Sequence, residues 1–282
     1  MHLPIQSTIQ SKGKLLDLST PVVMGILNAT PNSFYNKGQD SNADGLLRIA
    51  EKMLKDGAAI LDIGGASTKP GEEIIDTDEE LKRIIPVITA IHRRFPDAWL
   101  SIDTYHAHVA KEAVSAGAAI VNDISAGHLD DEMIRTVAAL KVPYIAMHMQ
   151  GTPKTMQQQP QYTDVDMEVR DYLKNACDQC TAAGIHDIII DPGFGFGKTV
   201  EHNFSLLRSM HTLRVLGKPI LAGLSRKSMV CKTLRVNPEH ALNGTTALNM
   251  VALQQGANIL RVHDVKEAME VIKLYEWVKN RN

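Results

Sequence analysis

The densest group of residues able to do chemistry follows a run of three isoleucines. Residues 188–190 are typical of a short strand buried on both faces, and the run ends at Asp191 before the Pro/Gly-rich loop 192–198. A charge in the middle of a buried strand is costly, so we expect Asp191 at the open carboxyl end of the strand, where a ligand can meet it. The alternative is that Asp191 only orients its own loop.

Other apolar runs also end on polar residues, and a first set of these offers hydrogen-bond acceptors. Asp103, Asn122 and Asp191 suit a neutral heterocycle with several N–H donors, such as an amino-pyrimidinone edge. Two nearby carboxylates repel each other unless donors are present, and Lys227 is placed to supply the opposite charge. Met147 and Phe196 are expected to give apolar faces for a flat ring. The polar residues at the strand ends are Asn28, Asp62, Asp103, Asn122, Asp123, His148, Asp191, Lys227, Arg261 and His263.

A second set is cationic. Arg261 and His263 alternate on the last strand and should point to the same face, while residues 225–228 start a helix with hydroxyls and cations. Asn28 and Thr68 add neutral ligands for a phosphate or a metal. The polar residues at the strand ends are therefore interpreted as a site for a flat polar ring beside a phosphate. The alternative is that Arg261 and Lys227 only neutralise carboxylates of the protein.

Several other motifs are incomplete. Gly197-Lys198-Thr199 looks like the end of a P-loop, but Pro192 stands where that motif needs its first Gly. Cys177 and Cys180 form a C-x-x-C within a helical pattern, which indicates two reduced thiols on one helix instead of a redox or zinc site. His106 and His108 begin a helix instead of ending a strand, which argues against a zinc hydrolase. No Ser/His/Asp set has nucleophile-elbow spacing.

The elements that carry these residues alternate regularly between strands and helices. A Gly-Ala pair at Gly57, Gly117 and Gly256, with Gly184 as a looser copy, stands between a helix and the next strand. Eight strand–helix units in about 250 residues predict an α/β fold, the (β/α)8 TIM barrel, over an open doubly wound sheet. Thr77 to Glu80 are expected to form a capping box. The predicted strands cover residues 22–27, 59–63, 99–102, 119–121, 144–147, 188–190, 219–223 and 258–260.

Composition limits the class of protein. With 282 residues, 44% hydrophobic and a net charge of -2, the chain is typical of an ordinary globular protein without nucleic-acid or membrane attraction. No apolar run reaches membrane-span length, and the start lacks a signal-peptide pattern. Three cysteines fit a reducing cytoplasm. We expect one domain over residues 1–282, with a hairpin extension in residues 1–20 and the barrel in about 21–282.

Taken together, the motifs resemble the dihydropteroate synthase family. The resemblance spans nearly the whole chain, in the right order, on all eight strands. It is carried by residues 28–34, 64–71, 101–104, 122–124, 147–151, 191–198, 225–228 and 261–264.

This resemblance implies an enzyme that joins 6-hydroxymethyl-7,8-dihydropterin diphosphate to 4-aminobenzoate and releases pyrophosphate. It also implies a Mg²⁺ cofactor on Asn28, a homodimer and inhibition by sulfonamides. The implied catalytic residues are Asp103, Lys227, Arg261 and His263. The implied pterin ligands are Asp103, Asn122, Met147, Asp191, Phe196, Lys227 and Arg261. The diphosphate ligands would be Asn28, Thr68, Arg261 and His263, and the aminobenzoate ligands Phe34, Lys69, Pro70, Phe196 and Ser228.

The loops after the first two strands depart from the family pattern. Asn32 and Asn36 stand where the family usually has Asp, and Ala66 and Lys69 where it usually has Glu and Arg. A missing carboxylate at Asn36 is expected to weaken Mg²⁺ binding, and Lys69 lacks the planar fork of Arg. Altered aminobenzoate or sulfonamide binding is therefore expected.

Three other functions fit the residues less fully. One is a relative that binds the pterin diphosphate without condensing it, and another is an unrelated phosphate-binding barrel. A third is a methyltetrahydrofolate-type methyltransferase with a corrinoid partner, whose substrate carries no diphosphate for Lys227, Arg261 and His263.

Overall fold

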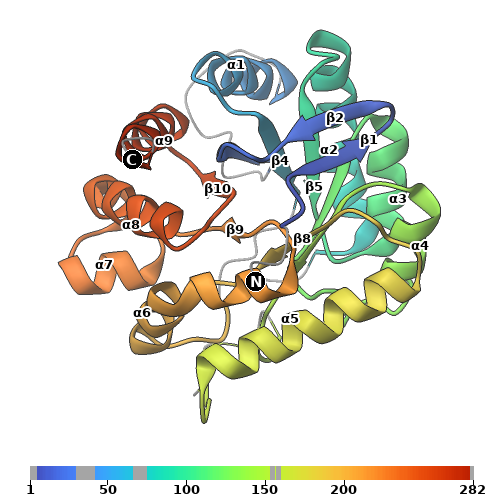
Figure 1. The fold of residues 1–282 in the computed structure, drawn as a ribbon. Helices are drawn as coiled ribbons and strands as arrows, with labels where there is room; N and C mark the ends of the chain where they lie inside the picture. The colour runs from blue at the N-terminus through green and yellow to red at the C-terminus, as the bar shows by residue number, and fades with distance from the viewer. Residues whose placement is uncertain (1–4, 30–41, 66–74, 153–155, 157–159, 280–282) are drawn as a thin grey trace.

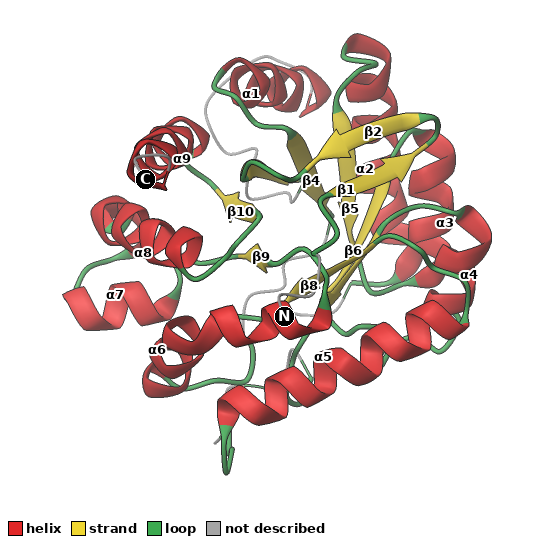
Figure 2. Cartoon of the chain, viewed as in Figure 1, coloured by secondary structure: helices red, strands yellow, loops and turns green. Residues whose placement is uncertain are grey.

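The structure is a computed structural model that describes residues 5–29, 42–65, 75–152, 156 and 160–279. Eight parallel strands form a ring with the helices around its outside (Figures 1 and 2). They are β3 (Val22–Asn28), β4 (Ile60–Gly64), β5 (Trp99–Asp103), β6 (Ile120–Asp123), β7 (Tyr144–Met147), β8 (Ile188–Asp191), β9 (Leu221–Ala222) and β10 (Ile259–Val262).

The strand order is that of a barrel. The hydrogen-bonded sequence runs β8-β7-β6-β5-β4-β3-β10-β9, and a parallel bridge between Ile190 and Ile220 joins the two ends. Each predicted strand is present within two residues at either end. The predicted (β/α)8 barrel is therefore confirmed.

The outer layer consists of helices that follow the strands. Their apolar faces pack on the outward-facing side chains of the strands in one large cluster. The helices are α1 (Asn42–Lys55), α2 (Thr77–Arg94), α3 (Ala107–Ala116), α4 (Met133–Leu140), α5 (Val165–Ala182), α6 (Val200–Ser209), α7 (Ser228–Leu234), α8 (Leu242–Gln254) and α9 (Val265–Lys279), with 3₁₀ turns η2 (Met210–Leu216) and η3 (Pro238–His240).

The repeated glycines end helices as predicted. Gly57, Gly117, Gly184 and Gly256 have φ values of 108°, 133°, 94° and 97°. Only glycine adopts such values cheaply, which explains why the same residue recurs before β4, β6, β8 and β10.

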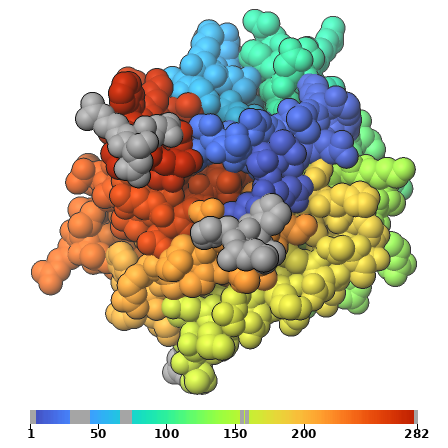
Figure 3. Space-filling model, viewed as in Figure 1, coloured from blue at the N-terminus to red at the C-terminus, as the bar shows by residue number. Residues whose placement is uncertain are grey.

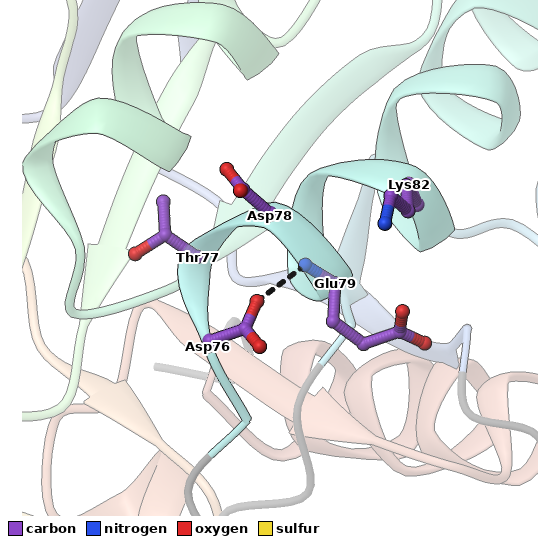
Figure 4. Close-up of a pocket in the computed structure, with 5 residues that line it drawn as sticks. All are labelled: Asp76, Thr77, Asp78, Glu79 and Lys82. Atoms are coloured by element: carbon purple, nitrogen blue, oxygen red, sulfur yellow. Dashed lines mark hydrogen bonds between the residues drawn. The ribbon is translucent and has the colours of Figure 1, made fainter.

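The capping box predicted for Thr77 to Glu80 is wrong by one residue. The cap of α2 is Asp76, whose carboxylate accepts a hydrogen bond of 2.8 Å from the backbone N–H of Glu79. Aspartate and threonine are both good caps, and the sequence does not separate neighbouring candidates. Figure 4 shows this cap in a small polar hollow that is lined by Asp76, Thr77, Asp78, Glu79 and Lys82.

The predicted hairpin at the start of the chain is confirmed. β1 (Thr8–Ser11) pairs with β2 (Lys14–Asp17), and Lys12 and Gly13 make the turn with positive φ values of 49° and 78°. Ile9 and Leu18 are buried against residues from the amino-terminal ends of the barrel strands. The hairpin lies across this end of the molecule between the helices (Figure 3), so the barrel is closed there and the other end is left for a ligand.

Two further predictions concern single helices. Cys177 and Cys180 are buried free thiols on α5, as expected. Among the described helices, none combines the length and apolar character that crossing a bilayer requires.

Candidate active site

The candidate site lies at the carboxyl ends of the barrel strands. Its lower layer is apolar and includes Ile60, Ile120, Ile145, Ile189 and Ile259. Side chains alternate along a strand, so the residue two positions further on each strand points to the same inner face. Those residues are Asp62, Asn122, Met147, Asp191 and Arg261, and Asp103 joins them from β5.

A buried ion-pair network occupies the floor of this mouth. The guanidinium of Arg261 donates from Nε to Asp62 at 2.6 Å and from Nη2 to Asp103 at 2.5 Å. Asp62 is fully buried and Asp103 nearly so. Arg261 therefore neutralises barrel carboxylates, as one interpretation of the sequence held. One of these carboxylates, Asp103, is itself a candidate ligand-binding residue, so Arg261 also contacts the candidate site.

The network leaves acceptor atoms for a ligand. Asn122 donates its amide N–H to Asp62 at 3.1 Å, which directs its carbonyl oxygen elsewhere. The second oxygen of Asp103 is buried and has no hydrogen-bond partner among the described residues. A buried acceptor without a partner costs free energy, and a donor on a bound ring would remove that cost.

Burial also changes the proton affinities of these groups. Desolvation raises the pKa of Asp103 to about 7, although Arg261 opposes the shift. Desolvation raises the pKa of Asp191 as well, against the hydrogen bond from Gly193 and the charge of Lys227. Desolvation lowers the pKa of Lys227 to about 8. Perturbed groups gathered in one mouth are typical of a functional site.

The loop after β8 is tightly folded behind Asp191. The backbone N–H of Gly193 donates to the Asp191 carboxylate at 2.7 Å. A Cβ on Gly193 would lie 1.9 Å from the carbonyl oxygen of His148, so only glycine fits there. Lys198 Nζ is buried within 2.8 Å of His148 Nδ1, and it donates to the carbonyls of Gly193 and Phe196. Lys198 thus binds its own loop, which agrees with rejecting a P-loop.

This loop also holds one wall of the mouth. Lys227 Nζ lies 4.2 Å from the centre of the Phe196 ring and donates to the Phe194 carbonyl at 2.7 Å. Phe196 and Met147 belong to one small apolar cluster, which provides the flat faces expected from the sequence. Its buried members are Tyr105, Ile124, Met147, Met149, Met156 and Phe196.

The second, cationic side of the mouth lies where β9 and β10 end. His263 follows β10 and is exposed, and its Nδ1 lies 3.0 Å from Ser225 Oγ. Ser228 is exposed at the first turn of α7, and Asn28 is exposed at the end of β3. The helix start predicted at residues 225–228 is confirmed.

Two polar strand-end residues lie outside this mouth. Asp123 faces the outer layer, where it accepts from Tyr144 Oη at 2.6 Å and from Ser125 and Gly127. His148 faces Lys198. Both lie one position beyond an inward-facing residue, so the alternation of the strand turns them away.

Several residues considered in the sequence analysis lie outside the described residues. They are Asn32, Phe34, Asn36, Ala66, Thr68, Lys69 and Pro70. Their roles remain predictions.

A magnesium ion would have few protein ligands here. Within the described ranges no group of three His, Cys, Asp or Glu side chains is placed to hold a metal. The exposed amide oxygen of Asn28 is a suitable hard donor, and Mg²⁺ commonly takes its other ligands from substrate phosphates and water. The donor set thus fits an ion that arrives with a phosphate-bearing substrate and does not fit one held by these residues alone.

Comparison with known proteins identifies the family of the chain. Residues 24–263 match the family model described as pterin binding enzyme. The chain is 42% identical over 274 residues to the dihydropteroate synthase of Haemophilus influenzae, covering 96% of this chain and 99% of the relative. The Yersinia pestis dihydropteroate synthase, solved with a sulfonamide drug, superposes with a TM-score of 0.91 at 43% identity over 96% of this chain and 99% of that one. The Xanthomonas albilineans dihydropteroate synthase, solved with 4-aminobenzoic acid, gives a TM-score of 0.92 at 38% identity over 98% and 99%.

Fold and mouth define a (β/α)8-barrel enzyme of the pterin-binding class. Within this class, the chain belongs to the dihydropteroate synthase family.

Proposed function

We propose that the chain condenses 6-hydroxymethyl-7,8-dihydropterin diphosphate with 4-aminobenzoate to give 7,8-dihydropteroate and pyrophosphate. The observation that carries this proposal is the set of inward-facing acceptors Asp103, Asn122 and Asp191 beside the apolar cluster of Met147 and Phe196. The complexes of related enzymes with a sulfonamide and with 4-aminobenzoic acid support the second substrate and inhibition by sulfonamides.

The acceptors recognise the pterin ring. The amino-pyrimidinone edge presents N–H donors that match the carboxylates of Asp103 and Asp191 and the amide oxygen of Asn122. Phe196 and Met147 cover the faces of the ring, and Lys227 balances the charge of Asp191. The low dielectric of this buried mouth strengthens each of these hydrogen bonds.

The diphosphate lies on the cationic side of the mouth. Arg261, His263 and Asn28 are the described residues that bind it, and Thr68 completes the set implied by the sequence. A Mg²⁺ ion bound with the diphosphate would neutralise negative charge on the leaving group.

The chemistry needs electrostatics and positioning more than proton transfer. The bond between the pterin methylene carbon and the diphosphate oxygen breaks, and its electron pair leaves with pyrophosphate. The electron-rich dihydropterin stabilises the carbon left behind, and the negative charge of the Asp103 carboxylate favours the positive charge on it. The arylamine nitrogen, a free nucleophile at neutral pH, then bonds to this carbon and releases a proton to solvent.

The aminobenzoate enters from the α7 side. Ser228 at the start of α7 binds its carboxylate, and Phe196 lies beside its ring. Phe34, Lys69 and Pro70 are further predicted ligands. The homodimer, the cytoplasmic location and the single domain over residues 1–282 also stay predictions.

A product assay tests this function. Purified protein is incubated with the pterin diphosphate, 4-aminobenzoate and Mg²⁺, and 7,8-dihydropteroate is measured by mass. Product is expected only with both substrates, and EDTA should abolish it. Tight binding of the pterin diphosphate without product would instead identify a non-catalytic relative.

A further inference from the structure

The turn after β9 is tied to the end of β10 by two adjacent residue pairs. Ser225 Oγ lies 3.0 Å from His263 Nδ1. The guanidinium of Arg226 donates to both carboxylate oxygens of Asp264, at 3.1 and 2.7 Å. Arg226 has a left-handed φ of 57°, which is uncommon for a residue other than glycine. Ser225 and Arg226, which are consecutive in the turn after β9, thus contact His263 and Asp264, which are consecutive after β10.

The hydrogen bonds of Ser225 determine which nitrogen of His263 carries the proton. Ser225 Oγ accepts from the backbone N–H of His263 at 3.2 Å. The serine is buried, and its hydroxyl hydrogen needs an acceptor. His263 Nδ1 is the acceptor that the described residues offer. A nitrogen that accepts a hydrogen bond is unprotonated, so the ring proton of a neutral His263 is on Nε2.

Desolvation and the neighbouring cations together keep the His263 ring neutral. Partial desolvation, together with the cations Arg226 and Arg261, lowers the pKa of His263 to about 4. Lys227 adds to this effect, and Asp264 opposes it but is already paired with Arg226. A neutral imidazole at neutral pH has two tautomers, and only one of them presents a donor on Nε2.

We propose that Ser225 is a positioning residue that fixes His263 as the Nε2–H tautomer, so that the exposed edge of the ring donates a hydrogen bond to the diphosphate. The inference rests on the proposed role of His263 in the function above. With the other tautomer, a nitrogen lone pair would face the phosphate oxygens and repel them. Ser225 would therefore act on leaving-group binding without touching the substrate.

The tautomer is measured directly in the ligand-free enzyme. Two-bond ¹H–¹⁵N correlation spectra of protein labelled on histidine distinguish Nδ1–H, Nε2–H and imidazolium rings, and His263→Gln identifies the signal. At pH 7.5 we expect the Nε2–H pattern in the wild type and a mixture of tautomers in Ser225→Ala. A wild-type Nδ1–H or imidazolium ring, or an unchanged pattern in Ser225→Ala, would overturn the proposal.

A binding experiment connects the tautomer to the leaving group. With inorganic pyrophosphate and Mg²⁺ as the probe, Ser225→Ala should raise the dissociation constant roughly 3- to 10-fold, the value of one lost hydrogen bond. Ser115→Ala, on an exposed helix face of α3, is the matched control and should change nothing. Equal affinities in Ser225→Ala and wild type would contradict the proposal. Failure of the product assay with the expected tautomer intact would instead count against the proposed function.

Discussion

At the scale of single residues, Asp62 shows how the mouth depends on a side chain that lies beneath it. This fully buried carboxylate accepts from Arg261 Nε and from the amide of Asn122. It therefore orients one cation and one acceptor of the site at once. The sequence marks Asp62 as a polar strand-end residue but does not separate a ligand-binding carboxylate from one that pairs with a buried arginine.

Replacing Asp62 should damage both stability and binding. Asp62→Asn removes one of the two negative charges that are paired with the buried guanidinium of Arg261, and we expect the free energy of unfolding to fall by about 3 kcal/mol. Urea denaturation measures this change. Asp178→Asn is the control, because Asp178 forms an exposed pair with Lys174 and should change stability by less than about 0.5 kcal/mol. Equal effects of the two substitutions would argue against the network.

The pH dependence of the reaction follows from two shifted groups. Asp103, with a pKa raised to about 7, accepts hydrogen bonds fully only above that pH. Lys227, with a pKa lowered to about 8, loses its charge above that pH. The kcat/KM for the pterin substrate, which reports on the free enzyme, should therefore rise up to about pH 7 and fall above about pH 8.

The matched variant for this profile is Lys227→Arg. An arginine keeps its charge throughout this range, so the alkaline fall should disappear even if the overall rate is lower. A profile that is flat between pH 6 and pH 9 in the wild type would contradict the assigned shifts.

A candidate site residue could be predicted from the sequence where the alternation of inward and outward side chains along its strand was clear. Asp103, Asn122, Met147, Asp191 and Arg261 share the inner face because each stands at an inward position of its strand. Asp123 and His148 stand one position further and face outward, although by type they are equally suited to a site. The bond between Ser225 and His263 joins residues 38 positions apart, and no local pattern indicates it.

At the scale of elements, the loop after β8 is held by Lys198. Its amine contacts the carbonyls of Gly193 and Phe196 and the ring of His148, and it is almost completely buried. Burial lowers the pKa of Lys198 well below its usual value. The sequence indicated only that Lys198 does not belong to a P-loop, because its partners are backbone atoms of a loop whose shape periodicity does not predict.

Removing this amine should loosen the wall that carries Phe196. Lys198→Met keeps the length of the side chain and leaves the two carbonyls without their partner, so we expect about 2 kcal/mol of lost stability. The KM for the pterin diphosphate should rise several-fold more than kcat falls, because we propose that Phe196 of this loop covers a face of the ring. Lys174→Met, on the exposed face of α5, should leave both constants unchanged. If the two variants behave alike, the loop does not need Lys198.

At the scale of the whole molecule, the two ends of the barrel have different tasks. The hairpin β1–β2 packs Ile9 and Leu18 onto the apolar layer at the amino-terminal end of the strands. Gln6 and the backbone of Gln10 also bind Asp187, the residue before β8. This end stabilises the barrel, and the opposite end carries the candidate site.

This division predicts a substitution that lowers stability and spares catalysis. Ile9→Ala removes a side chain that is 1% exposed and should cost about 2 to 4 kcal/mol, as measured by thermal or urea unfolding. The kinetic constants should stay within about twofold at temperatures where the variant is folded. Leu15→Ala, at a position 66% exposed on the same hairpin, is the control and should change neither. A large loss of kcat in Ile9→Ala would show that the two ends are coupled.

The overall architecture was largely predictable from the sequence, and for a physical reason. Buried strands, amphipathic helices and left-handed glycines each leave a local pattern, and their regular recurrence indicates a closed ring. The choice of Asp76 over Thr77 as the cap of α2 leaves no such pattern. Contacts between distant loops, such as Arg226 with Asp264, depend on how the ring closes.

We propose above all that inward-facing acceptors of the barrel mouth recognise the pterin ring, and this proposal has a direct test. It is tested most directly by calorimetric titration of 6-hydroxymethyl-7,8-dihydropterin, which lacks the diphosphate, into wild type, Asp191→Asn and Asp178→Asn at pH 7.5. We expect an affinity about 30-fold weaker for Asp191→Asn, the value of a hydrogen bond to a charged group, and an unchanged affinity for Asp178→Asn. Wild-type affinity in Asp191→Asn would contradict it.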